Sequence, residues 1–141
     1  MIAYMDTSAL VKLFVLEQGS KEVDEIASRV DALATSMVAY AEARATFARL
    51  FREGFTTARK HGTRIAKLND DWEKYIRVEL TPALARSAGE AAEAYGLRGF
   101  DAIHLASALS LRDRIAIPCL FAAFDQRLRA AAASAGLEVI P

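Results

Sequence analysis

Short apolar segments alternate with helical patterns along the chain, and this alternation limits the possible folds more than any other feature. Most of the segments are almost wholly apolar, and residues 76–80 alternate with a period of two. Strands of a parallel sheet are buried on both faces and have this composition. The expected strands are residues 2–5, 33–35, 76–80, 119–124 and 137–140. The pattern predicts a three-layer α/β/α fold, in which helices cover both faces of a parallel sheet.

Cap residues and apolar spacing place helices between these strands. Ser36 is expected to cap a long helix that ends near Gly54, and Thr81 with Pro82 begins another helix. The expected helices are residues 7–18, 20–30, 37–53, 56–75, 82–95, 100–112 and 126–135. Since no repeat, low-complexity tract or linker interrupts the 141 residues, we expect one domain, residues 1–141.

Composition excludes several classes of protein. The 18 Lys and Arg balance 18 Asp and Glu, so the bulk charge indicates no polyanionic partner. Cys119 stands alone, which excludes an internal disulfide. The start of the chain has no secretory pattern, and no apolar run approaches the ~20 residues of a membrane span. We therefore expect a soluble, cytoplasmic protein that does not contact a membrane.

Four acids are the candidates for chemistry. Asp6 and Asp125 end expected strands, Glu42 lies among apolar residues in a long helix, and Asp101 lies in the first turn of another. The carboxyl ends of parallel strands meet at one edge of a sheet, where α/β folds bind ligands. If the fold brings the acids together, their repulsion requires a cation, and oxygen ligands favour Mg²⁺ or Mn²⁺.

Each acid also has a structural explanation. Asp6 and Asp125 are suited to cap a helix, and Asp101 suits the helix dipole. Glu42 is harder to explain in this way, because an unpaired carboxylate near apolar side chains is costly.

Three polar residues near the acids, Thr7, Ser8 and His104, also have both a functional and a structural interpretation. Thr7 and Ser8 either bind a metal-held water or a phosphate, or they cap the helix locally. His104 either helps orient a carboxylate or water, or it is a satisfied structural histidine. Glycine-rich nucleotide motifs and the G-x-S-x-G elbow are absent, and two His with one Cys cannot build the usual structural zinc site.

Four segments together resemble the PIN-domain family, and most closely its VapC-type toxins from bacterial toxin–antitoxin pairs. The segments are YMDTSALVK at 4–12, SMVAYAEA at 36–43, FDAIHLA at 100–106 and FDQRL at 124–128. The first and third are specific, the other two would be weak alone, and residues 54–98 carry no signature.

The resemblance implies an Mg²⁺- or Mn²⁺-dependent endoribonuclease with a five-stranded parallel sheet. Carried over by position, the catalytic and metal-binding cluster would consist of Asp6, Glu42, Asp101 and Asp125. Ser8 (or Thr7) would support this cluster. The resemblance further implies a homodimer, an RNA substrate, and an antitoxin partner whose tail covers the acidic groove.

Basic residues concentrate between residues 39 and 70, where we expect Arg44, Arg49 and Arg52 to hold an RNA backbone without choosing its sequence. A solvated helical face explains these arginines equally well.

Three other functions remain open. An RNA-processing PIN nuclease would lack an antitoxin, and a non-catalytic RNA- or protein-binding module would show no metal dependence. A phosphatase forming an aspartyl-phosphate on Asp6 would normally need a second acid at the position of Ser8, together with a discrete catalytic lysine.

Overall fold

The computed structural model describes residues 1–141. Five strands form one fully parallel sheet in the order β3-β2-β1-β4-β5. The strands are β1 (Ile2–Met5), β2 (Ala32–Ser36), β3 (Ile76–Val78), β4 (Cys119–Ala122) and β5 (Glu138–Ile140). The predicted α/β fold with a five-stranded parallel sheet is confirmed.

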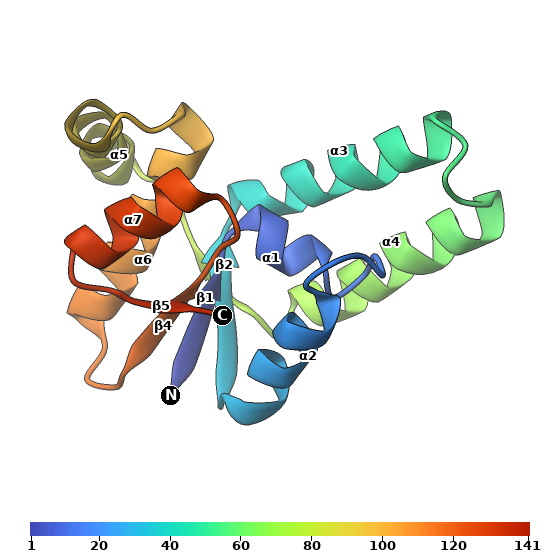
Figure 1. The fold of residues 1–141 in the computed structure, drawn as a ribbon, viewed down its shortest axis with the longest axis horizontal. Coiled ribbons are helices and arrows are strands. Elements are labelled where there is room, and N and C mark those ends of the chain that lie inside the picture. The colour runs from blue at the N-terminus through green and yellow to red at the C-terminus, as the bar shows by residue number, and fades with distance from the viewer.

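The chain has seven helices, which together form one layer on each face of the sheet (Figure 1). They are α1 (Thr7–Val11), α2 (Ser20–Arg29), α3 (Val38–Arg52), α4 (Ala58–Trp72), α5 (Pro82–Tyr95), α6 (Gly99–Arg114) and α7 (Gln126–Ser134). Helices α1–α4 cover one face and α5–α7 the other, and the α3–α4 hairpin projects beyond the sheet (Figure 1).

Each layer has its own apolar core. Tyr4 and Phe121, on neighbouring strands, stack at 5.7 Å between ring centroids in the core beneath α5–α7. Met5 and Ala122, one position further along the same strands, belong to the core beneath α1–α4. Successive side chains of a strand point to opposite faces, and both faces are covered here. This two-sided burial is the reason why the central strands are apolar throughout.

The first helix is shorter than predicted. It ends at Val11 rather than near residue 18, and residues 12–14 form turns. Phe14 nevertheless packs against Phe47 of α3, with ring centroids 6.0 Å apart. The apolar spacing beyond Val11 therefore reflects burial on α3 rather than a continuing helix.

Strands β3 and β4 also end earlier than predicted, because each ends with its neighbour. Val78 is paired with Ser36, the last residue of β2, and Ala122 is paired with Met5, the last residue of β1. Ser36 thus belongs to the strand, and its hydroxyl accepts a hydrogen bond from the N–H of Val38 at 3.3 Å. The prediction that Ser36 is the N-cap of the long helix is therefore wrong: Met37 is the N-cap of α3, and its side chain makes no capping bond.

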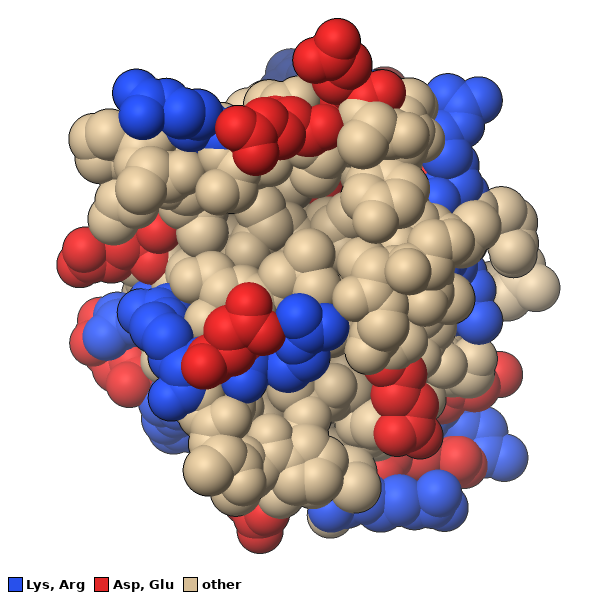
Figure 2. All heavy atoms as spheres, turned by 90° about the vertical axis from the view of Figure 1, so that its left-hand side faces the viewer, with Lys and Arg blue, Asp and Glu red and all other residues tan.

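The end of the molecule formed by α5, α6 and α7 carries few charges. Figure 2 shows this face, where uncharged residues cover most of the surface and small groups of both signs are interspersed. It carries no broad field of one sign, so an anion bound there must rely on individual side chains. No helix of the structure is long and apolar enough to cross a membrane.

Candidate active site

Asp6 is held at the carboxyl end of β1, in the middle of the sheet. Its side chain caps α1, since Oδ1 accepts a hydrogen bond from the N–H of Ala9 at 2.9 Å and one from the hydroxyl of Ser8 at 2.7 Å. Its backbone N–H donates to the carbonyl of Ala122 on β4 at 3.1 Å. The residue is only 4% exposed. The fold therefore fixes the position of this carboxylate from three sides.

The charge of Asp6 is poorly compensated. Burial raises the pKa of its carboxyl group and the neighbouring Asp101 raises it further, although His104, the Ala9 N–H and the Ser8 hydroxyl lower it. No Lys or Arg is among the groups that act on it. A divalent cation would supply the missing positive charge.

Glu42, in the second turn of α3, is held by side chains from two other elements. The hydroxyl of Thr7 donates to Oε1 at 2.5 Å, and Nε2 of His104 lies 3.0 Å from the same oxygen. Burial raises the pKa of Glu42, but the hydrogen bonds from His104 and Thr7 outweigh burial and hold the pKa below its usual value. Glu42 is thus ionised at neutral pH, and its Oε2 makes no hydrogen bond within the chain.

His104 is buried, at 1% exposed, and connects β1 with Glu42. Its Nδ1 lies 2.9 Å from the hydroxyl of Tyr4, and its Nε2 lies 3.0 Å from Oγ1 of Thr7 as well as facing Glu42. Because Glu42 is ionised and a carboxylate only accepts hydrogen bonds, Nε2 of His104 carries a proton and donates it to Oε1. The network therefore directs an N–H at the Glu42 carboxylate.

Asp101 and Asp125 lie at the N-terminal ends of α6 and α7. Asp125 is the N-cap of α7, and its Oδ1 accepts a hydrogen bond from the N–H of Leu128 at 2.9 Å. Asp101 accepts a hydrogen bond at Oδ2 from Nε of Arg98 at 3.1 Å. The second oxygen of each carboxylate makes no hydrogen bond within the chain.

A hollow of 540 Å³ lies between these two helix ends. Two acids, two arginines, an amide and an aromatic ring line it: Arg98, Asp101, Phe124, Asp125, Gln126 and Arg127. Asp101 is also the electrostatic neighbour of Asp6, and Asp6 in turn is the neighbour of His104. The four acids thus form a row along the carboxyl edge of the sheet. The hollow links Asp125 with Asp101, Asp101 acts electrostatically on Asp6, and Glu42 is connected to Asp6 only through His104.

The row of acids is not a ready-made metal cage. No group of three or more His, Cys, Asp and Glu side chains is arranged to hold a metal ion. The acids therefore do not form one compact cluster in this structure, and their joint role as metal ligands stays a prediction. Their chemistry still suits Mg²⁺ or Mn²⁺, because three of them keep an unbonded oxygen and the charge of Asp6 lacks a cation.

The arginines expected to hold RNA lie on α3, which extends away from the sheet (Figure 1). Arg44 donates to the hydroxyl of Tyr40 at 2.9 Å, Arg49 lies 3.8 Å from Glu53, and Arg52 ends the helix. None of the three lines the hollow beside the acids.

Three residues of this site were not predicted from the sequence, and a fourth has a different role from the one predicted. Arg98 and Arg127 line the hollow, and their signal was their place at a helix start next to a candidate acid. Tyr4 was expected only as part of an apolar strand, although its hydroxyl meets His104. Thr7 is predicted, like Ser8, to bind a metal-held water or a phosphate or to cap the helix, whereas in the structure the two hydroxyls hold different acids.

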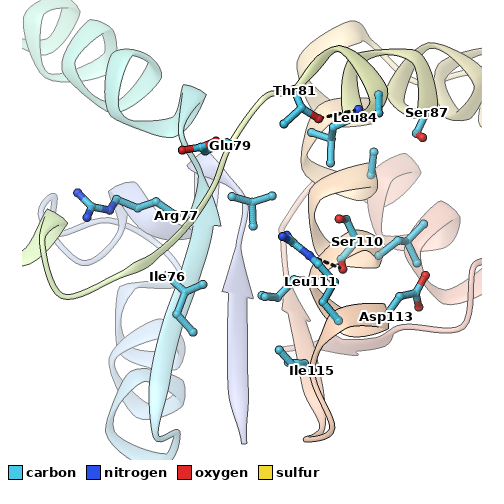
Figure 3. Close-up of a pocket in the computed structure, with 15 residues that line it drawn as sticks. Ile76, Arg77, Glu79, Thr81, Leu84, Ser87, Ser110, Leu111, Asp113 and Ile115 are labelled. Atoms are coloured by element: carbon cyan, nitrogen blue, oxygen red, sulfur yellow. Dashed lines mark hydrogen bonds between the residues drawn. The ribbon is translucent and has the colours of Figure 1, made fainter.

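A larger cavity, 860 Å³, lies elsewhere. It runs between edge strand β3 and helices α5 and α6, with Ile76 and Arg77 on the strand side and Ser110 and Asp113 on the α6 side (Figure 3). None of the four predicted acids lines it, and neither does His104. The chemistry therefore favours the smaller hollow.

Comparison by sequence relates the chain to known proteins over almost its whole length. A family model described as the PIN domain matches residues 3–134. Two curated relatives from Mycobacterium tuberculosis are named ribonuclease VapC45 and ribonuclease VapC49. Each is 38% identical over 147 aligned positions, which cover 99% of this chain and 95% of the relative.

Comparison by structure gives the same fold. FitAcB from Neisseria gonorrhoeae superposes with a TM-score of 0.67 at 17% identity, over 100% of this chain and 97% of that chain. VapC20 from Mycobacterium tuberculosis, described as a toxin that cleaves the sarcin–ricin loop, superposes with a TM-score of 0.64 at 20% identity, over 99% of each chain. At these identities the agreement concerns the fold, and it matches the fold predicted from the sequence.

Proposed function

Because the chain belongs to the PIN-domain family, we propose that it is a metal-dependent endoribonuclease, acting as the toxin of a toxin–antitoxin pair. Residues 1–141 would act as one ribonuclease domain. The observation that carries the proposal is the row of carboxylates at the carboxyl edge of the sheet, with a buried carboxylate at Asp6 that no Lys or Arg compensates. The relatives named as ribonucleases support the same activity.

The site residues divide into holders of metal and one acceptor of protons. Asp6, Asp101 and Asp125 would hold Mg²⁺ or Mn²⁺, which when bound makes a water more acidic and neutralises charge on the phosphate. Ser8 and the N–H of Ala9 keep Asp6 in place. The reaction then also requires a positioned base.

Glu42 is suited to that task. It is ionised, Thr7 and His104 fix its Oε1, and its Oε2 is free to accept a hydrogen bond from the attacking water. In-line attack of this water on the phosphorus would form a new P–O bond, break the bond between phosphorus and the 3′ oxygen, and pass a proton of the water to Glu42. The leaving 3′ oxygen would take up a proton from solvent, which gives 5′-phosphate and 3′-hydroxyl ends.

The proposed partners follow the relatives. Solved structures of similar fold include a toxin–antitoxin complex from Klebsiella pneumoniae and VapBC2 from Rickettsia felis bound to a DNA fragment from their promoter. We therefore include in the proposal an antitoxin that covers the acidic edge. A homodimer and a cytoplasmic location belong to the proposal as well, on the resemblance to the family alone.

Cleavage of RNA is expected only with a divalent metal ion. The purified protein, free of antitoxin, is incubated with a panel of structured RNAs in Mg²⁺, in Mn²⁺ and in EDTA, next to the Asp101→Asn variant. We expect cleavage with either metal, none in EDTA, and a loss of at least about 10²-fold in the variant. Thermal unfolding with and without Mn²⁺ reports metal binding independently of cleavage.

The exposed Asp24→Asn variant on α2 is the matched control and should behave like the wild type. Cleavage that persists in EDTA would contradict the metal-dependent mechanism. Stabilisation by Mn²⁺ without cleavage of any RNA would favour a binding module instead.

A further inference from the structure

The hollow beside Asp101 and Asp125 contains two arginines whose positions folding stability does not explain. Arg98 is the N-cap of α6 and makes no side-chain capping bond there. Arg127 lies in the first turn of α7, which contains no acidic residue. A helix N-terminus favours negative charge and short capping side chains, so a cation at this place is unfavourable. Two arginines placed against this preference, both lining the same hollow, indicate that the hollow binds a ligand.

The interactions that hold Arg98 and Arg127 are weak and leave donors free. The side chain of Arg98 is 79% exposed and uses only Nε for its bond to Asp101. An exposed pair of this kind contributes little to stability. Arg127 uses Nη1 to donate to the carbonyl of Gly96 at 3.2 Å. Both guanidinium groups therefore keep several N–H donors for an anion in the hollow.

Phosphate is the anion that fits this arrangement. A guanidinium group binds phosphate oxygens with two parallel hydrogen bonds, which a lysine cannot reproduce. The rest of the surface at this end of the molecule has no broad basic field (Figure 2), so binding must come from a few placed side chains. The carboxylates of Asp101 and Asp125 in the same hollow would repel a phosphate unless a cation stood between them.

We propose that Arg98 and Arg127 bind the phosphates of single-stranded RNA that flank the bond to be cut, and so set the strand across the row of acids. This inference rests on the proposed ribonuclease function and adds the residues that position its substrate. It replaces the arginines of α3 as the expected binding partners of the RNA backbone. It also gives Arg98 a second role. In the absence of RNA this side chain is paired with the carboxylate of Asp101 and so competes with a metal ion for it.

The two arginines should then differ in one measurable respect. Arg98→Gln removes a phosphate ligand and also frees Asp101 from a neighbouring cation, so this variant should bind RNA more weakly and Mn²⁺ more tightly. Arg127→Gln removes only a phosphate ligand, so it should bind RNA more weakly with unchanged affinity for Mn²⁺. A merely structural role of Arg98 would not weaken RNA binding and at the same time tighten Mn²⁺ binding. A merely structural role of Arg127 would not weaken RNA binding alone.

Binding is measured by fluorescence anisotropy with a labelled single-stranded RNA over a range of salt concentrations. The measurements use the Asp6→Asn background with Mg²⁺, so that the RNA stays intact. We expect each variant to bind about tenfold more weakly. The slope of log K against log salt should be smaller by about 0.7 for each phosphate that the variant no longer neutralises. Mn²⁺ affinity is measured without RNA in proteins that keep Asp6. Arg86→Gln, an exposed arginine on α5, is the control and should change neither quantity.

Failure of this inference differs from failure of the ribonuclease proposal. If wild-type protein cleaves RNA but both variants keep its affinity and salt slope, the two arginines do not bind phosphate. If Arg98→Gln binds Mn²⁺ no more tightly than wild type, Arg98 does not occupy a metal-binding carboxylate. If the wild type neither binds nor cleaves RNA, the ribonuclease proposal itself is wrong.

Discussion

Replacing Asp6 with asparagine is expected to lower the rate of RNA cleavage by about 10³-fold or more without loss of the fold. The carboxylate ends the central strand and is the acid with the least compensated charge. A metal-bound carboxylate contributes several kcal/mol to the transition state, and each 1.4 kcal/mol is about tenfold in rate. Asparagine caps a helix as well as aspartate does, so the bond from Ala9 N–H is expected to survive.

Stability should move in the opposite direction. Because burial raises the pKa of Asp6, ionising this carboxylate costs folding free energy, and asparagine avoids this cost. The metal-free variant should therefore unfold at the same or a higher temperature than wild type. Added Mn²⁺ should stabilise the wild type and have less effect on the variant.

Cleavage rates and thermal unfolding, each with and without Mn²⁺, test this prediction. Asp24→Asn removes an exposed carboxylate from α2 and should leave both measurements unchanged. An Asp6→Asn protein that cleaves at the wild-type rate would remove Asp6 from the mechanism. One that has lost its fold would show that the loss of rate is not a catalytic effect.

The parts of the fold that could be predicted depend on residues close together in the sequence, such as helix caps. Asp6, Thr81 and Asp125 all cap the helices that the sequence assigned to them, since a cap depends on residues only a few positions apart. The common edge of the acids followed from the parallel topology, which alternating strands and helices require. Element ends were less predictable, because β3 stops where its neighbour β2 stops and α1 gives way to turns packed on α3.

The interactions inside the site could not be predicted, because they join residues that are far apart in the sequence. His104 meets Glu42 across 62 positions of the chain and Tyr4 across 100. No spacing rule reaches that far, so the sequence could not decide whether His104 is a structural histidine or a residue that orients a carboxylate. In the structure it is both, because the same buried ring contacts the hydroxyl of Tyr4 and orients the Glu42 carboxylate.

The second large effect is expected at His104. Truncation to alanine leaves a buried cavity and removes the His104 partner of the Tyr4 hydroxyl and one of the two partners of Glu42 Oε1. The free energy of unfolding should fall by about 2–4 kcal/mol. In addition, kcat should fall by about 10- to 100-fold, the usual effect of losing a residue that orients a metal-site carboxylate. KM should change little, because His104 is buried and does not contact RNA.

Two further variants separate orientation of Glu42 from general loss of stability. Leu105→Ala, at the next position of α6, removes a fully buried side chain with no polar contact to the site. It should destabilise the protein by a similar amount and leave kcat of the folded protein unchanged. His104→Gln keeps an N–H donor on the side chain, so it should recover part of kcat relative to alanine. Equal kcat values for wild type and His104→Ala, measured where both are folded, would show that Glu42 acts without this support.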